Sequence, residues 1–123
     1  MVINMEIVSK NDITVVIIEK DQIISSVQDF LDIMADARYL HQCTHIIIYK
    51  ESLGDRFFDL KTGYAGEILQ KFSNYKMKLA IIGDFSEYKS KSLRDFIYEC
   101  NNGSCVFFKP TVEDGLAALS MSS

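Results

Sequence analysis

The sequence predicts an α/β domain built on a mixed sheet of about five strands, with about four helices packed against it. Four short runs rich in β-branched and aromatic residues, at 13–18, 45–49, 77–83 and 105–108, alternate with segments of helical periodicity. Each run is almost continuously apolar, which is typical of parallel strands covered on both faces. With one antiparallel strand at the edge, the expected element order is ββαβαβαβα in a single domain over residues 1–123.

The edge strand is expected in the opening segment, because apolar and polar residues alternate over residues 3–10. Asn11 and Asp12 follow this segment and favour a tight turn into the run at 13–18. These two segments should therefore form an antiparallel hairpin, while the four apolar runs should lie parallel to one another.

Four segments combine helical spacing with a residue that can cap a helix. Ser25 or Ser26 precedes the first, whose apolar residues are Val27, Phe30, Leu31, Met34 and Leu40. The second begins at Thr62 and carries a stripe of Tyr64, Ala65, Ile68, Leu69 and Phe72. Ser90 or Ser92 opens the third, which should end near residues 101–103, and Thr111 opens the last.

The composition excludes several classes of protein. Apolar residues make up 48% of the 123 residues and charged residues 24%, as in a globular domain. A net charge of −4 argues against nucleic acid as a partner, although the stretch from Lys71 to Arg94 is locally basic. We find neither a secretory signal nor a membrane-spanning segment, and the three cysteines, without a CxxC pair, fit a reducing compartment. A cytoplasmic location is therefore expected, with no membrane partner.

Motifs for catalysis, metals and cofactors are missing from the chain. His41 and His45 precede a strand, which places them at the opposite edge of the sheet from Asp84 and Thr62. The segment HQCTH could project His41, Cys43 and His45 from one face, but three ligands this close together rarely form a whole metal site. No nucleotide-binding glycine motif occurs. We therefore expect no catalytic residue, no metal and no cofactor.

Two glycines mark the start of the second helix, Gly63 and Gly66, although each costs about 1 kcal/mol relative to alanine inside a helix. Glycine allows a neighbouring helix, an anion or another chain to approach the backbone closely. One interpretation is close packing within the domain. The other is a docking surface flanked by Phe57 and Phe58, with Thr62 exposed as a candidate phosphorylation site.

A second candidate site lies at the carboxyl ends of the parallel strands, where ligands of α/β proteins usually bind. An anionic metabolite could be held there by Lys50 or Lys61, together with Thr62 and Asp84. Asp84 could equally cap the turn that follows its strand.

The stretch FFDLKTGYAGEILQKFSNYKMKLAIIGDFSEYKSKSLRDFIYECNNG closely resembles a bacterial family of domains of unknown function, family 4180, over about residues 13–119. More distantly, the element order is similar to the STAS domain of anti-sigma-factor antagonists. Those proteins carry a phosphorylatable Ser or Thr directly before a glycine at a helix start, and Thr62 and Gly63 occupy the comparable place. The chain departs from that pattern because ESLGDRFFDLK separates the preceding strand from Thr62.

The leading hypothesis is a non-catalytic regulatory or protein-interaction domain with a STAS-like fold and a protein partner. The rival is a protein that binds an anionic metabolite, or a minor enzyme, using the crevice at the strand ends. A homodimer is also considered, because right-handed crossovers in a sequential sheet place the helices mostly on one face. Either one helix crosses to the second face, or another chain covers it.

Overall fold

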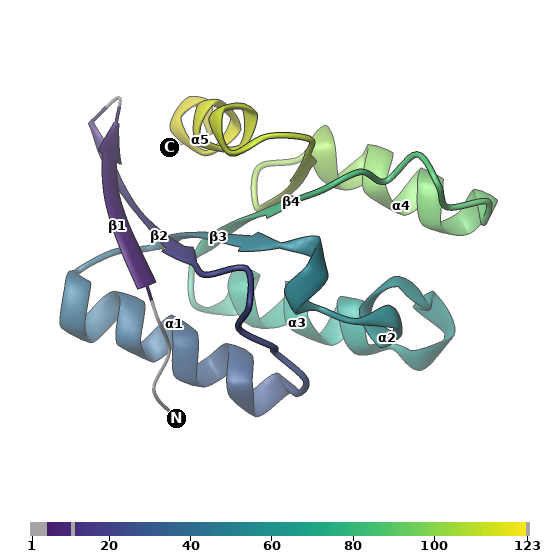
Figure 1. Ribbon diagram of the computed structural model, residues 1–123, viewed down its shortest axis with the longest axis horizontal. Helices are drawn as coiled ribbons and strands as arrows, with labels where there is room; N and C mark the ends of the chain where they lie inside the picture. Colours follow the sequence, from purple (N-terminus) through teal and green to yellow (C-terminus); the bar gives the residue numbers. More distant parts are fainter. Residues whose placement is uncertain (1–4, 11, 123) are drawn as a thin grey trace.

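The computed structural model describes residues 5–10 and 12–122 and confirms the mixed five-stranded sheet (Figure 1). Its strands are β1 (Met5–Lys10), β2 (Ile13–Ile18), β3 (His45–Tyr49), β4 (Lys78–Ile82) and β5 (Val106–Lys109), which lie in the order β1-β2-β3-β4-β5. β1 pairs antiparallel with β2, and the other neighbours are parallel. The expected first strand began at residue 3, which lies outside the described residues.

The helices are α1 (Val27–His41), α2 (Asp55–Phe58), α3 (Tyr64–Asn74), α4 (Lys91–Asn101) and α5 (Val112–Met121), with short 3-10 turns at Lys50–Ser52 and Leu60–Thr62. The caps of α1, α4 and α5 are Ser26, Ser90 and Thr111, because their hydroxyls accept first-turn N–H groups at 3.1, 3.2 and 3.1 Å. α2 was not predicted, since ESLGDRFFDLK has no helical periodicity of useful length. No helix in the described part of the chain is long and apolar enough to cross a bilayer.

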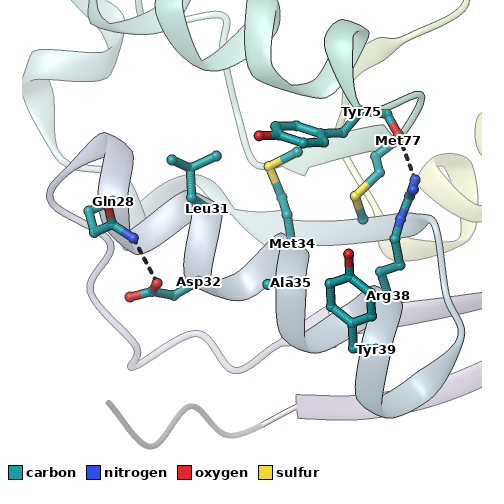
Figure 2. A pocket seen from close by; sticks show the side chains of 9 residues that line it. All are labelled: Gln28, Leu31, Asp32, Met34, Ala35, Arg38, Tyr39, Tyr75 and Met77. Carbon is teal, nitrogen blue, oxygen red and sulfur yellow. Dashed lines mark hydrogen bonds between the residues drawn. The ribbon is translucent and has the colours of Figure 1, made fainter.

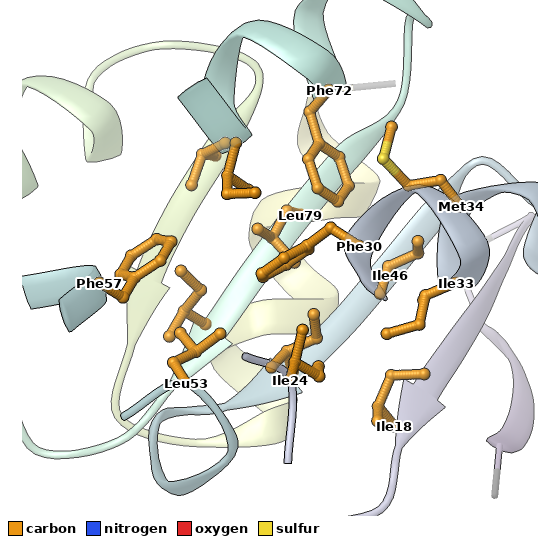
Figure 3. Close-up of a cluster of buried hydrophobic side chains, with 14 of the residues drawn as sticks. Ile18, Ile24, Phe30, Ile33, Met34, Ile46, Leu53, Phe57, Phe72 and Leu79 are labelled. Atoms are coloured by element: carbon orange, nitrogen blue, oxygen red, sulfur yellow. The ribbon is translucent and has the colours of Figure 1, made fainter. Parts of the chain in front are cut away.

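Strand residues alternate between two apolar faces, which is why the runs are continuously apolar in the sequence. One face consists of Val16, Ile18, Ile46, Ile48, Leu79, Ile81, Val106 and Phe108, packed against residues from α1 to α4. Figure 3 shows this face, where Phe30 of α1 meets Phe72 of α3 edge to face with ring centroids 6.3 Å apart. Full burial of a side chain of this kind stabilises the fold by about 1.5–3 kcal/mol.

The second face is covered by α5, which lies on the opposite side of the sheet from α1 and α3 (Figure 1). Gly115 permits close contact, since an added Cβ would lie 2.8 Å from Ile82 Cδ1 and 3.3 Å from the Cβ of Ala80. A crossing helix within one chain therefore explains the doubly covered strands. The strand pattern no longer argues for a homodimer, and the oligomeric state remains a prediction.

The last turn of α1 extends beyond the core. The buried residues of α1 are Phe30, Ile33, Met34 and Ala37. Leu40, which the sequence places on the same stripe, lies in the last turn and is 70% exposed, beside Tyr39 at 80%. This end of α1 therefore presents apolar surface to solvent.

Candidate functional site

The start of α3 brings the predicted residues Thr62, Gly63 and Gly66 together on the surface, and all of them are exposed. Gly63 has a φ of +74°, in the left-handed region that favours glycine, so the backbone turn itself requires this residue. The Thr62 hydroxyl donates to the carbonyl of Asp59 at 2.8 Å and accepts the N–H of Tyr64 at 3.2 Å. Thr62 is therefore accessible and also holds the turn that precedes the helix.

Gly66 has a different environment. It lies in the first turn of α3, and among the described residues no heavy atom approaches within 4 Å of a Cβ built on it, the helix's own nearby backbone aside. Close packing within the domain, one of the two interpretations of the glycines, therefore does not account for Gly66. The backbone of α3 is open to the outside at this point.

The prediction that Phe57 and Phe58 flank this surface as part of the docking site needs correction. Both lie in α2, and they are only 1% and 8% exposed. Phe57 contacts the Tyr64 ring edge to face at 6.0 Å, and Phe58 stacks on Tyr88 at 5.0 Å. The two rings thus support the start of α3 from within the core and do not present themselves to a partner.

A groove runs beside α3 from Gly66 towards Lys76, and we call it the α3/α4 groove. Its first part has a volume of about 350 Å³ and includes Gly66, Leu69 and Val106, and its second part, of about 220 Å³, includes Lys76 and Lys78. Ser73, Ser104 and Cys105 line both parts, so the two hollows adjoin. The sequence did not predict this groove, because its far wall comes from the turn before β5. The available signal was Leu69, an apolar residue three positions after Gly66 in the predicted helix.

At the carboxyl edge of the sheet, Lys50 and Asp84 come together as predicted, because they follow the neighbouring strands β3 and β4. The Lys50 ammonium donates to the Asp84 carbonyl at 2.9 Å, pairs with the Glu87 carboxylate and lies 4.8 Å from the centre of the Tyr88 ring. Burial lowers the pKa of Lys50, but the hydrogen bonds and charges of Glu87 and Tyr88 outweigh burial and raise it overall. Lys50 is therefore already engaged within the domain.

Lys61 does not join this cluster. Its backbone N–H donates to the Asp59 carboxylate at 3.2 Å, so it belongs to the Thr62 turn. The hollow at the sheet edge, about 330 Å³, is lined by Gly83, Asp84, Phe85, Phe108 and Pro110, without either lysine. The predicted set of Lys50, Lys61 and Asp84 is thus not assembled around one cavity.

Asp84 caps the turn that follows β4, as the alternative interpretation held. Its carboxylate accepts the backbone N–H of Ser86 at 2.9 Å and the Ser86 hydroxyl at 2.6 Å. These hydrogen bonds lower the pKa of Asp84. A carboxyl group that stays ionised in this way is suited to a structural role rather than to that of a general base at neutral pH.

The cysteines are free thiols, and Cys43 is buried with its Sγ donating to the carbonyl of Thr14 at 2.8 Å. Burial, together with the neighbouring Cys105 and Glu99, raises the pKa of Cys100 to about 11. Such thiols are protonated and weakly nucleophilic at neutral pH. Within residues 5–10 and 12–122, no group of three or more His, Cys, Asp or Glu side chains is arranged to hold a metal ion.

Fold and site together define a small α/β domain with an open helix start and an adjoining apolar groove. Residues 9–119 match the family described as Domain of unknown function (DUF4180), and the chain belongs to this family. No curated protein and no solved structure matches the chain. The family resemblance found in the sequence is confirmed, while the STAS resemblance and the bacterial origin remain predictions.

Proposed function

We propose that this protein is a non-catalytic regulatory domain that binds a partner protein over the start of α3 and along the α3/α4 groove. The main observation behind the proposal is the open space around Gly66. A glycine inside a helix costs about 1 kcal/mol relative to alanine, and apart from the adjoining stretch of α3 itself no described atom lies within 4 Å of a Cβ placed on Gly66. A glycine that internal packing does not require is consistent with a surface that another chain approaches closely.

The chemistry of the groove indicates what kind of segment it would bind. Leu69 provides apolar surface next to Gly66, and the opposite end is lined by Lys76 and by Lys78, whose ammonium donates to the Ser104 carbonyl. A partner segment with an apolar side chain near Gly66 and a carboxylate near Lys76 would complement both ends. Because Lys76 is exposed, added salt should weaken the interaction.

Thr62 is the proposed point of regulation. Phosphorylation would replace the hydroxyl hydrogen, which removes the hydrogen bond to the Asp59 carbonyl, and would add about two negative charges. The positive end of the α3 dipole favours an anion at this position, but an acidic partner segment would be repelled. We expect modification of Thr62 to release the partner.

The predicted resemblance to STAS domains is consistent with this proposal. The sheet has a sequential strand order, and Thr62 and Gly63 directly precede α3, although α2 and two short 3-10 turns lie between β3, the second parallel strand, and α3. The free cysteines are consistent with a reducing, cytoplasmic location. A metabolite site at the carboxyl edge receives less support, since Glu87 already neutralises Lys50.

The test compares Gly66→Leu with Ala117→Leu, a change of similar size at an exposed position on α5. A partner recovered with the unmodified protein is identified and purified, and its affinity is measured by titration calorimetry at two salt concentrations. We expect Gly66→Leu to weaken binding about tenfold or more, as for a central interface position, and Ala117→Leu to leave it unchanged. Unchanged affinity in a Gly66→Leu protein that melts cooperatively would show that the docking surface is wrong.

A further inference from the structure

A separate pocket of about 340 Å³ opens beside α1, and we call it the α1 pocket (Figure 2). Its apolar lining includes Leu31 and Met34 from α1 and Met77, the residue before β4, and Tyr39, Tyr75 and Arg38 surround it. The volume lies in the range of about 300–1,000 Å³ that is usual for small-molecule sites. Met77 also borders the Lys76 end of the α3/α4 groove, but Gly66 and Thr62 take no part in the pocket.

Arg38 is the polar group that this pocket leaves incompletely satisfied. One terminal nitrogen donates to the backbone carbonyl of Tyr75 at 2.5 Å. Its Nε is shielded from solvent and has no acceptor among the described residues. A buried donor without an acceptor costs free energy, particularly on a charged group. A small shift of the guanidinium towards a bound anion would satisfy Nε and a terminal nitrogen together, which is the bidentate pairing that arginine forms with carboxylates.

The rest of the pocket suits a flat apolar body. Met34 and Met77 are only 3% and 2% exposed, so they form the floor of the pocket. Their side chains are flexible and polarisable, so they can shift to bring sulfur against an aromatic ring. Tyr39 and Tyr75 are 80% and 53% exposed, which is a large aromatic surface to leave in water. A ring inserted between them would cover that surface and gain stacking contacts.

The charges of the pocket determine how such a ligand would be oriented. Figure 2 shows Arg38 at one end of the pocket and the pair Gln28 and Asp32 at the other. The Gln28 side-chain amide donates to the Asp32 carboxylate at 2.9 Å, which leaves a negative group at that end. An anionic group on the ligand is therefore directed towards Arg38 and away from Asp32.

We propose that the α1 pocket binds a small aromatic carboxylate, with its ring against Met34 and Met77 and its carboxylate on Arg38. This site is distinct from the proposed protein interface and does not depend on it.

Nuclear magnetic resonance on protein with ¹³C-labelled methionine methyl groups tests the proposal directly. Phenylacetate and indole-3-acetate are the probes, and benzyl alcohol is the uncharged control. We expect saturable shifts of the Met34 and Met77 signals with the acids, with dissociation constants between about 1 µM and 1 mM. Met121, which is 87% exposed, should stay unshifted and serves as the internal reference.

Arg38→Gln should weaken binding of the acids about tenfold or more, because it removes the charged donors. Arg94→Gln removes the same charge from an exposed position on α4 and should leave binding unchanged. If the methionine spectrum shows that Arg38→Gln fails to fold, Tyr39→Ala, a substitution at an exposed position, is tested in its place. We expect Tyr39→Ala to weaken binding of the acids about threefold or more.

The proposal is overturned if neither acid produces saturable shifts at Met34 and Met77, or if benzyl alcohol binds as tightly as the acids. Equal losses in Arg38→Gln and Arg94→Gln would also overturn it, since binding would then follow net charge. If Tyr39→Ala is tested in place of Arg38→Gln, an unchanged affinity for the acids would also overturn the proposal.

Discussion

Gly63 and Gly66 stand one turn apart at the start of α3 for different physical reasons. Gly63 is held at a φ of +74°, whereas Gly66 is helical and has open space around the position of a Cβ. The backbone alone explains the first glycine and does not explain the second. This contrast separates a structural requirement from a candidate contact with a partner.

Replacing Gly63 by alanine should therefore lower the stability of the fold, whereas replacing Gly66 by alanine should raise it. Gly63→Ala is expected to destabilise the fold by about 1–2 kcal/mol, because an L-residue is strained in the left-handed region. Gly66→Ala is expected to stabilise it by about 0.5–1 kcal/mol through helix propensity. Urea unfolding measures both, and a loss of stability in Gly66→Ala would mean that internal packing does require this glycine.

The Thr62 hydroxyl should contribute to stability even without a partner. Thr62→Ala loses the hydrogen bonds to Asp59 and Tyr64 and should cost about 0.5–2 kcal/mol, as for loss of a helix-capping hydroxyl. Thr62→Ser keeps both bonds and should stay close to the unmodified protein. Thermal unfolding of the three proteins checks this, and equal stability of the Ala and Ser variants would contradict the role of the Thr62 hydroxyl in holding this turn.

Phe57 should behave as a core residue. Phe57→Ala removes a ring that is 1% exposed and should destabilise the fold by about 3–5 kcal/mol. Tyr98→Ala, at a ring that is 70% exposed on α4, serves as the control and should stay within about 0.5 kcal/mol. Chemical denaturation compares the two variants. A loss of stability below about 1 kcal/mol in Phe57→Ala would indicate that the Phe57 ring is exposed rather than buried.

The turn after β4 should lose its support at acid pH. Hydrogen bonds from Ser86 lower the pKa of Asp84, and a carboxyl with a lowered pKa stabilises the fold above its unfolded pKa. That contribution is lost as the pH falls through the lower folded value. Ser86→Ala should move the pKa of Asp84 up towards its ordinary value of 3.8, which a carboxyl NMR titration can follow. A pKa that does not move in the variant would point to a different cause.

Cys100 should react slowly with alkylating agents. Burial, Cys105 and Glu99 raise its pKa to about 11, so little thiolate is present at neutral pH. Labelling with iodoacetamide at neutral pH, followed by peptide mass spectrometry, should show slow modification in the folded protein and full modification in urea. Rapid labelling of Cys100 without denaturant would contradict this environment.

Local patterns in the sequence were sufficient to predict the sheet. Strands are recognised from runs such as ITVVII, and the starts of α1, α4 and α5 from a serine or threonine whose hydroxyl bonds to the next turn. The exposed position of Thr62 and Gly63 at a helix start was predicted in the same way. All of these features depend on residues close together in the chain.

Features that join distant segments were decided by the tertiary structure. The side of the sheet taken by α5 depends on the contact of Gly115 with Ile82, and the burial of Phe57 depends on its contact with Tyr64. The α3/α4 groove and the α1 pocket likewise combine residues from separate elements. Periodicity shows which residues avoid water, whereas these contacts depend on which elements pack together. The sequence alone therefore determined the strands of the sheet and the caps of the helices. The packing of the elements determined the surfaces that are available for binding.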